Sequence, residues 1–164
     1  LAPGAYTWYD LIHIGAPEPQ TFRQSLDRLT HFLDEVISAY PVDPARVYLL
    51  GFSQGAVMSL ALLLTVPEKL AGGVALSGYV PHTVDLNVRR EALAGRNVLI
   101  VHGTYDPLIP VTYGRQARDY LARMPVALTY REHPLGHQIS PESLADVASW
   151  LRQELDRTEA RPPA

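Results

Sequence analysis

The chain has 164 residues, of which 47% are hydrophobic and 19% are charged, and this composition predicts one globular domain. Lys and Arg number 14 and Asp and Glu number 17, a net charge of −3 that argues against nucleic acid as the main partner. No apolar stretch approaches the roughly 20 residues that span a bilayer, so no membrane span is expected. The chain has no cysteine, which excludes disulfides, thiolate nucleophiles and cysteine-based zinc sites.

Helix and strand patterns alternate along the chain. Apolar residues spaced three and four apart predict helices at residues 22–40, 113–124 and 144–155. A further helix-like run, residues 56–63, follows the first strand. Short apolar runs predict buried parallel strands, the last nearer the sheet edge: residues 46–50, 73–77, 97–101 and 126–130. Ser140 is the expected N-cap of the last helix. The alternation predicts an α/β fold with residues 1–156 as one domain and 157–164 as a flexible tail.

A candidate nucleophile follows the first predicted strand, in the sequence Gly51-Phe52-Ser53-Gln54-Gly55. Strand, sharp turn and helix form the context in which G-x-S-x-G holds a reactive serine, because the turn strains the serine backbone and requires small flanking residues. The backbone N–H of Gln54, at the helix N-terminus, would point to where an oxyanion develops. An ordinary strand-to-helix turn is the alternative, and the matching context favours the nucleophile.

An acid and a base follow Ser53 in the chain order expected of this arrangement. Asp106 lies just past the third predicted strand and His137 lies past the fourth, so three loops bring Ser53, Asp106 and His137 to the carboxyl edge of one sheet. Asp85, after the second strand, is an alternative acid, whereas Asp119 falls within a helix pattern. His133 is the alternative base, and we favour His137 because it follows the flexible Gly136.

The spacing of the histidines predicts no metal site. His133 and His137 are four residues apart, but Pro134 and Gly136 between them prevent the helix on which zinc-binding pairs of this spacing lie. His102 is expected to support the Asp106 loop.

Aromatic and apolar residues near the three loops are candidates for an acyl pocket. Trp8 lies in an irregular N-terminal segment, Tyr79 follows the second strand, and Leu108 and Ile109 follow the acid. Ordinary core packing is the alternative for each of them. Because no charged cluster accompanies the candidate triad, we expect an apolar, uncharged ester as the substrate.

These motifs resemble the phospholipase/carboxylesterase family of α/β-hydrolases, which includes bacterial carboxylesterases, lysophospholipases and acyl-protein thioesterases. The Ser-Gln pair within G-F-S-Q-G-A is the more specific mark, and the resemblance covers nearly all of residues 5–155. It implies an α/β-hydrolase fold, with Ser53, Asp106 and His137 as the triad and the Gln54 amide as one oxyanion donor. It also implies that Trp8 borders the acyl site.

The family's pattern has a further part at the front, where a strand and an H-G-x-G-type loop supply the second oxyanion donor. Only residues 1–7 precede Trp8 here, so we expect the sequence to be the larger piece of a longer hydrolase that lacks the N-terminal strands. The strand at 46–50 would then form an apolar sheet edge. We expect a missing N-terminal segment or a second copy in a homodimer to cover that edge.

Taken together, the residues and the resemblance predict a serine carboxylesterase that hydrolyses short- to medium-chain esters through an acyl-enzyme. The expected partner is a small-molecule acyl ester, with no metal or organic cofactor, and the expected location is cytoplasmic. Hydrolysis of lysophospholipids or acyl thioesters would use the same residues. A non-catalytic, hydrolase-like binding module is the alternative from another class.

Overall fold

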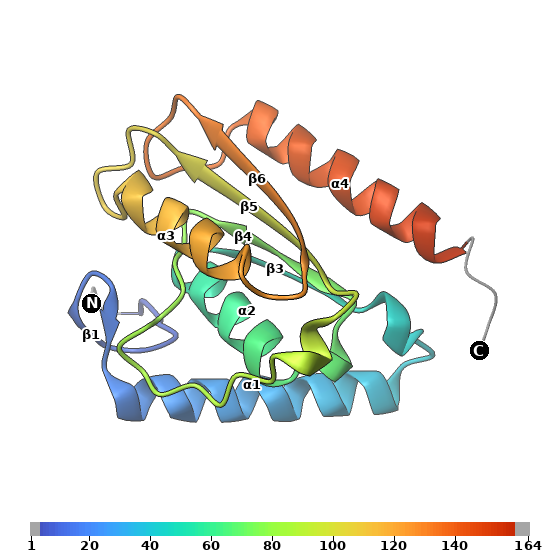
Figure 1. Ribbon diagram of the computed structural model, residues 1–164. Helices are drawn as coiled ribbons and strands as arrows, with labels where there is room; N and C mark the ends of the chain where they lie inside the picture. The colour runs from blue at the N-terminus through green and yellow to red at the C-terminus, as the bar shows by residue number, and fades with distance from the viewer. Residues whose placement is uncertain (1–3, 160–164) are drawn as a thin grey trace.

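The computed structural model describes residues 4–159 and contains a four-stranded parallel sheet (Figure 1). The sheet order is β3-β4-β5-β6, with bounds Tyr48–Phe52, Gly72–Leu76, Asn97–Gly103 and Ala127–His133. Each predicted strand is confirmed within two residues at its start, and β6 lies at one edge of the sheet, as predicted. The strands are in register so that their carboxyl ends meet at one side, where β3 ends at Phe52 opposite Leu76 of β4.

Four helices cover the two faces of this sheet, with bounds Pro19–Ala39 for α1, Gln54–Thr65 for α2, Val111–Leu121 for α3 and Pro141–Glu159 for α4. In Figure 1, α1, α2 and α3 lie on one side of the sheet and α4 lies on the other. Side chains alternate accordingly: Ala75 and Ile100 face the first group, whereas Val74 and Leu99 pack with Trp150 of α4. This three-layer arrangement is an α/β-hydrolase fold.

Helix α2 lies between the sheet and α1, and the residues from Ala56 to Leu64 are all buried. A helix that is apolar on every side needs such a sandwiched position. Helix α1 is amphipathic instead, and it buries Phe22 and Leu33 while its outer face is exposed. The site-bearing turn at the start of α2 is therefore anchored in the centre of the molecule.

The ends of the helices follow their local sequences. Glu18 caps α1 by accepting hydrogen bonds from the backbone N–H groups of Gln20 and Thr21. At α4, the Ser140 hydroxyl accepts from the Ser143 N–H at 3.2 Å and the Ser143 hydroxyl accepts from the Ser140 N–H at 2.9 Å, so the predicted N-cap is confirmed. Helix α4 extends to Glu159, past the predicted start of the tail at 157, and residues 160–164 lie outside the described residues.

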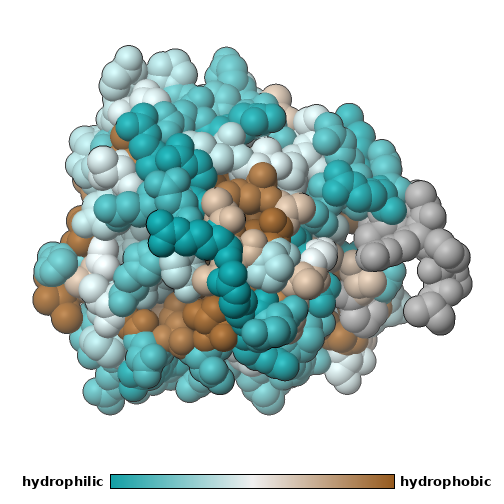
Figure 2. Space-filling model, in the orientation of Figure 1, coloured by the Kyte–Doolittle hydropathy of each residue, from teal (hydrophilic) through white to brown (hydrophobic). Residues whose placement is uncertain are grey.

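The N-terminal segment differs from the sequence prediction of an irregular stretch. It contains a short antiparallel hairpin of β1 (Leu11–His13) and β2 (Ala16–Pro17), which is too brief to give a strand pattern. Apolar side chains gather at the left edge of the molecule in Figure 2, where Figure 1 places β1. Within residues 4–159 there are also three single-turn 3₁₀ helices: Pro44–Arg46, Pro67–Lys69 and Glu91–Leu93.

Candidate active site

Ser53 occupies a strained turn between β3 and α2. Its backbone has φ 55° and ψ −120°, a conformation that non-glycine residues rarely adopt. A Cβ at Gly51 would lie 2.1 Å from the carbonyl oxygen of Gly55, so Gly51 has to be glycine for the turn to close. A Cβ at Gly55 would meet only the Trp8 ring, at 3.7 Å, which is an ordinary contact. Of the two glycines that flank Ser53, only Gly51 is therefore required for steric reasons.

Three predicted site residues are hydrogen-bonded in series at the carboxyl edge of the sheet. The Nε2 atom of His137 lies 2.9 Å from the Ser53 hydroxyl oxygen, and its Nδ1 atom lies 2.7 Å from Oδ2 of Asp106. Because a carboxylate only accepts, Nδ1 carries a proton and Nε2 is left to accept the proton of Ser53. The ring of Phe52 packs against the His137 ring, with centroids 4.8 Å apart, and restricts its orientation.

The carboxylate of Asp106 has no solvent exposure, and hydrogen bonds to both of its oxygens fix its orientation. Its Oδ1 atom accepts hydrogen bonds from the backbone N–H groups of Leu108 at 2.9 Å and Ile109 at 2.8 Å, while Oδ2 accepts from His137. Burial alone would raise the pKa of Asp106, but the hydrogen bonds from His137, Ile109 and Leu108 outweigh it and hold the pKa below its usual value. The Asp106 side chain is therefore a carboxylate anion at neutral pH, where it can stabilise a protonated His137.

His102 supports this loop from within the core. Its Nε2 atom lies 2.8 Å from the carbonyl oxygen of Ile109, so it donates there, and it is 3.8 Å from Oδ2 of Asp106. The imidazole fits beside α3 because Gly114 has no side chain: a Cβ there would lie 2.5 Å from Nδ1 of His102. His102 therefore supports the Asp106 loop, as expected from the sequence, through its hydrogen bond to Ile109.

The side chain of Gln54 makes contacts that its place in the sequence does not predict. Its Oε1 accepts from the Thr7 hydroxyl at 2.6 Å and from the Trp8 N–H at 3.1 Å, and its Nε2 donates to the Tyr9 carbonyl oxygen at 3.0 Å. Its backbone N–H stands in the first turn of α2, where such groups have no partner within the helix. One residue thus provides a free N–H beside Ser53 and holds the N-terminal segment against it.

The predicted substrate residues surround a cavity of about 440 Å³ next to Ser53. Trp8 and Leu108 stand at its rim and are 47% and 58% exposed, whereas Tyr79 and Ile109 form buried walls. Ile14 and other residues of the N-terminal segment complete the lining. No Lys, Arg, Asp or Glu side chain is part of it, so the described cavity has no cation to bind a carboxylate or phosphate.

Two tyrosines with buried hydroxyls are among the residues that line this cavity. Burial raises the pKa of Tyr79, and burial together with the neighbouring Tyr79 raises that of Tyr9. Both phenols are therefore neutral in the physiological range. The Tyr9 ring packs on Phe22 of α1, with centroids 5.1 Å apart, which connects the cavity wall to the helix beneath it.

The alternative residues lie elsewhere. His133 pairs with Asp146 of α4, with Nε2 2.9 Å from Oδ2. Asp119 is exposed and pairs with Arg118, and Asp85 is exposed outside the Ser53 cavity. Between residues 4 and 159, no three or more His, Asp and Glu side chains cluster as a metal site would require. None of the helices in that range has the length and apolar character to cross a lipid bilayer.

The sheet, the strained turn and the linked side chains define a class of protein, the α/β-hydrolases that hold serine, histidine and aspartate at one sheet edge. Comparison with known proteins specifies it further. The chain belongs to the Phospholipase/Carboxylesterase family, whose model matches residues 2–155.

Individual relatives cover most of this chain. Carboxylesterase SOBER1 of Arabidopsis thaliana is 30% identical over 156 residues, which are 91% of this chain and 68% of that protein. Acyl-protein thioesterase 1 of Candida albicans is 29% identical over 160 residues, covering 92% of this chain and 69% of that protein. The crystal structure of Arabidopsis SOBER1 superimposes with a TM-score of 0.78 at 28% identity, covering 91% of this chain and 74% of that one. The chain spans 61 to 69% of the length of three curated relatives it matches.

Proposed function

We propose that the protein is a serine carboxylesterase that cleaves short- to medium-chain, uncharged esters through an acyl-enzyme. The observation that carries this proposal is the unbroken series of hydrogen bonds from Ser53 through His137 to Asp106, beside a largely apolar cavity that Ser53 and His137 help to line. A serine hydroxyl needs an adjacent base to become nucleophilic, and the base needs a group that fixes its tautomer. The names of the relatives, carboxylesterase and acyl-protein thioesterase, agree with this chemistry.

In the proposed reaction, a named residue acts in each step. The Ser53 oxygen attacks the ester carbonyl carbon while its proton moves to Nε2 of His137, and Asp106 stabilises the resulting imidazolium. The carbonyl oxygen becomes an anion, which accepts a hydrogen bond from the Gln54 backbone N–H. His137 returns its proton to the leaving alcohol. Water then attacks the acyl-enzyme, with His137 again as base, and releases the acid and free Ser53.

The lining of the cavity supports an uncharged substrate. Its apolar residues exclude water from the acyl group, while the absence of charged groups among the described lining residues leaves a carboxylate or phosphate without a counter-ion. The four residues predicted to bind substrate, Trp8, Tyr79, Leu108 and Ile109, all face this space, which supports the same role for them.

The test is hydrolysis of p-nitrophenyl acetate and butyrate by the full chain and by Ser53→Ala. We expect the alanine variant to lose hydrolysis by a factor on the order of 10⁵ or more, because no other described residue replaces the nucleophile. Ser149→Ala, on the exposed face of α4, is the matched control. If Ser53→Ala hydrolyses both esters as fast as the parent, Ser53 is not the nucleophile.

Acyl thioesters or lysophospholipids are a second candidate substrate class, favoured by the thioesterase name of one relative. The same three residues would act on the same type of carbonyl carbon. Comparing an oxyester with the thioester of the same acyl group separates the two, since the better kcat/KM identifies the preferred leaving group. A non-catalytic binding module predicts instead that a fluorophosphonate leaves Ser53 unlabelled.

The edge at β3 carries a separate proposal about partners. Among the described residues β3 pairs only with β4, and Leu50 on this edge is 51% exposed. An apolar strand with open hydrogen-bonding groups pairs readily with another strand. We propose that such a strand covers it, from a segment outside the described residues or from a second copy. Light scattering distinguishes these sources, because only the second makes a dimer.

A further inference from the structure

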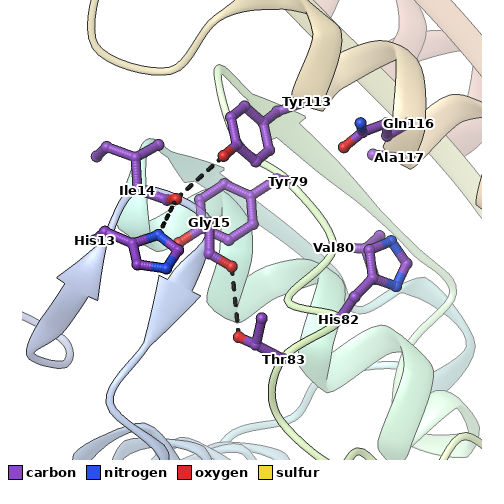
Figure 3. A pocket seen from close by; sticks show the side chains of 10 residues that line it. All are labelled: His13, Ile14, Gly15, Tyr79, Val80, His82, Thr83, Tyr113, Gln116 and Ala117. Atoms are coloured by element: carbon purple, nitrogen blue, oxygen red, sulfur yellow. Dashed lines mark hydrogen bonds between the residues drawn. The ribbon is translucent and has the colours of Figure 1, made fainter.

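A second cavity adjoins the one at Ser53. It has a volume of about 240 Å³ and lies between the β1–β2 turn, α3 and the loop after β4. The two cavities share two lining residues, Ile14 and Tyr79, and we call this pair the partition. Figure 3 shows the Tyr79 ring beside Gly15 of the turn and below Tyr113 of α3, with Val80 and His82 on its other side.

The Tyr79 side of this partition is anchored in the core. Tyr79 is only 3% exposed and packs in one cluster with Tyr9 and Val57. Its ring also meets the Tyr113 ring, with centroids 5.5 Å apart. The ring of Tyr79 therefore cannot swing out of the way without disturbing α2 and α3.

The Ile14 side is held by the hairpin turn. The Tyr113 hydroxyl donates to the Ile14 carbonyl oxygen at 3.1 Å, and the Thr83 hydroxyl donates to the Gly15 carbonyl oxygen at 3.4 Å (Figure 3). Gly15 has φ 85°, and a Cβ there would lie 2.6 Å from the Tyr113 ring. Close packing of the ring on a glycine thus fixes where Ile14 stands.

We propose that Tyr79 and Ile14 set the acyl-chain length that the enzyme accepts, with the second cavity as an extension that they close off. The proposal rests on the proposed esterase function of the Ser53 site. His137 must face the alcohol oxygen that it protonates, so we infer that the acyl group lies along the tyrosine-lined part of the cavity, where Tyr9 and Tyr79 belong to its lining. An acyl chain that outgrows this space meets the Tyr79 ring.

Opening the partition gives a measurable change in selectivity. Each additional methylene that becomes buried improves binding about fourfold, so an octanoyl group gains over a butyryl group once its last carbons enter the second cavity. We expect Tyr79→Ala to raise the ratio of kcat/KM for p-nitrophenyl octanoate to that for the butyrate at least about tenfold. Tyr79→Phe keeps the ring, and Tyr40→Ala removes a remote, exposed tyrosine, so both should leave the ratio within about twofold of the parent.

Ile14→Ala is the second variant, because Ile14 is 37% exposed in a turn and its truncation does not threaten the core. It should raise the same ratio about threefold or more. A series of acetate esters from methyl to octyl tests the orientation, and its selectivity should not change in either variant. An unchanged octanoate ratio in both variants, or a change confined to the alcohol series, overturns the proposal.

A binding measurement keeps this inference separate from the esterase function itself. In a Ser53→Ala background, where no turnover occurs, Tyr79→Ala should tighten the calorimetric Kd of decanoic acid methyl ester by about tenfold and leave that of methyl butyrate within a factor of about two. If the parent hydrolyses no ester but this tightening occurs, the esterase proposal fails and the partition stands. If the parent is active and decanoate binding is unchanged, the partition fails alone.

Discussion

The cavity at Ser53 has two walls of different construction. The wall that carries Ser53, Asp106 and His137 grows from the ends of β3, β5 and β6, and its acid is buried and hydrogen-bonded to backbone N–H groups. The opposite wall, residues 7–14, belongs to a short hairpin and an extended segment with exposed apolar side chains. Apart from Tyr9, which packs in the core on Phe22, it is attached through single side chains of other elements, among them Gln54 and Tyr113.

The difference indicates how chemistry and selectivity are divided. Reacting groups must keep their mutual geometry to a fraction of an ångström, and strand ends of a buried parallel sheet provide that rigidity. The part that contacts the substrate's variable end can be held more loosely. Four predictions test this contrast between a fixed wall and an attached wall, from the largest expected effect to the smallest.

Asp106→Asn breaks the fixed wall at its most buried contact. The amide oxygen can still accept from Leu108 and Ile109, but the amide cannot stabilise the imidazolium or select the right tautomer of His137. We expect kcat for p-nitrophenyl butyrate to fall about 10⁴-fold with little loss of stability. Asp119→Asn, at an exposed ion pair, is the control. A loss below about tenfold would contradict the role of Asp106.

The turn that bears Ser53 should respond very differently to alanine at its two glycines. Gly51→Ala places a methyl group 2.1 Å from the Gly55 carbonyl oxygen, and we expect it to lower the free energy of unfolding by about 3 kcal/mol. Gly55→Ala meets only the Trp8 ring and lies in a helix, so stability should stay within about 1 kcal/mol of the parent. Urea titrations of both variants measure this, and equal losses would disprove the asymmetry.

Gln54→Ala detaches the second wall while keeping the backbone N–H beside Ser53. Loss of the three hydrogen bonds to Thr7, Trp8 and Tyr9 should cost about 1–2 kcal/mol and speed amide hydrogen exchange at Trp8. KM should rise more than kcat falls, because the reacting groups stay in place. Gln24→Ala, exposed on α1, serves as the control. Unchanged exchange at Trp8 would mean that Gln54 does not hold this segment.

The smallest effect concerns the base of the His137 loop, at the end of β6. The guanidinium of Arg115 lowers the pKa of Glu132 to about 2 against the opposing effect of burial, and the Tyr130 hydroxyl also contributes. A carboxylate whose folded pKa lies below its unfolded value, roughly 4.3, adds stability above that value and loses it as the pH falls towards 2.

We therefore expect Glu132→Gln to unfold about 0.5–1 kcal/mol more easily than the parent at pH 7, as is typical of partly exposed ion pairs. The difference should shrink between pH 4.5 and 2. Thermal unfolding of both proteins across that range measures it, and Glu91→Gln, in a short surface helix, is a suitable reference. A difference independent of pH would assign the loss to packing instead of charge.

The fixed wall was largely predictable from the sequence, and the attached wall was not. Ser53, Asp106 and His137 each follow an apolar run that reads as a buried strand, and parallel strands end at the same sheet edge, so their meeting follows from local patterns. Three-residue strands such as Leu11–His13 give no such pattern. Nothing near Gln54 in the sequence indicates that its side chain binds residues 45 and more positions away.

The steric requirements around the site were predicted less well than the positions of its residues. The motif suggested equal need for small residues on both sides of Ser53, yet only Gly51 faces backbone too close for a methyl group. The partition residue Tyr79 was predicted to touch substrate, but its second cavity depends on how the hairpin and α3 close around it. Such closure depends on the packing of three separate elements, which residue spacing does not encode.

The fit of His102 beside Gly114 has a consequence for variation in this protein. Gly114 lies on α3, away from the cavity at Ser53, and an inspection of the active site alone would treat it as free to change. A methyl group there would displace the His102 ring, and with it the Ile109 carbonyl and the loop that presents Asp106. In a mutational scan for activity, this position should behave as one of the site's own residues.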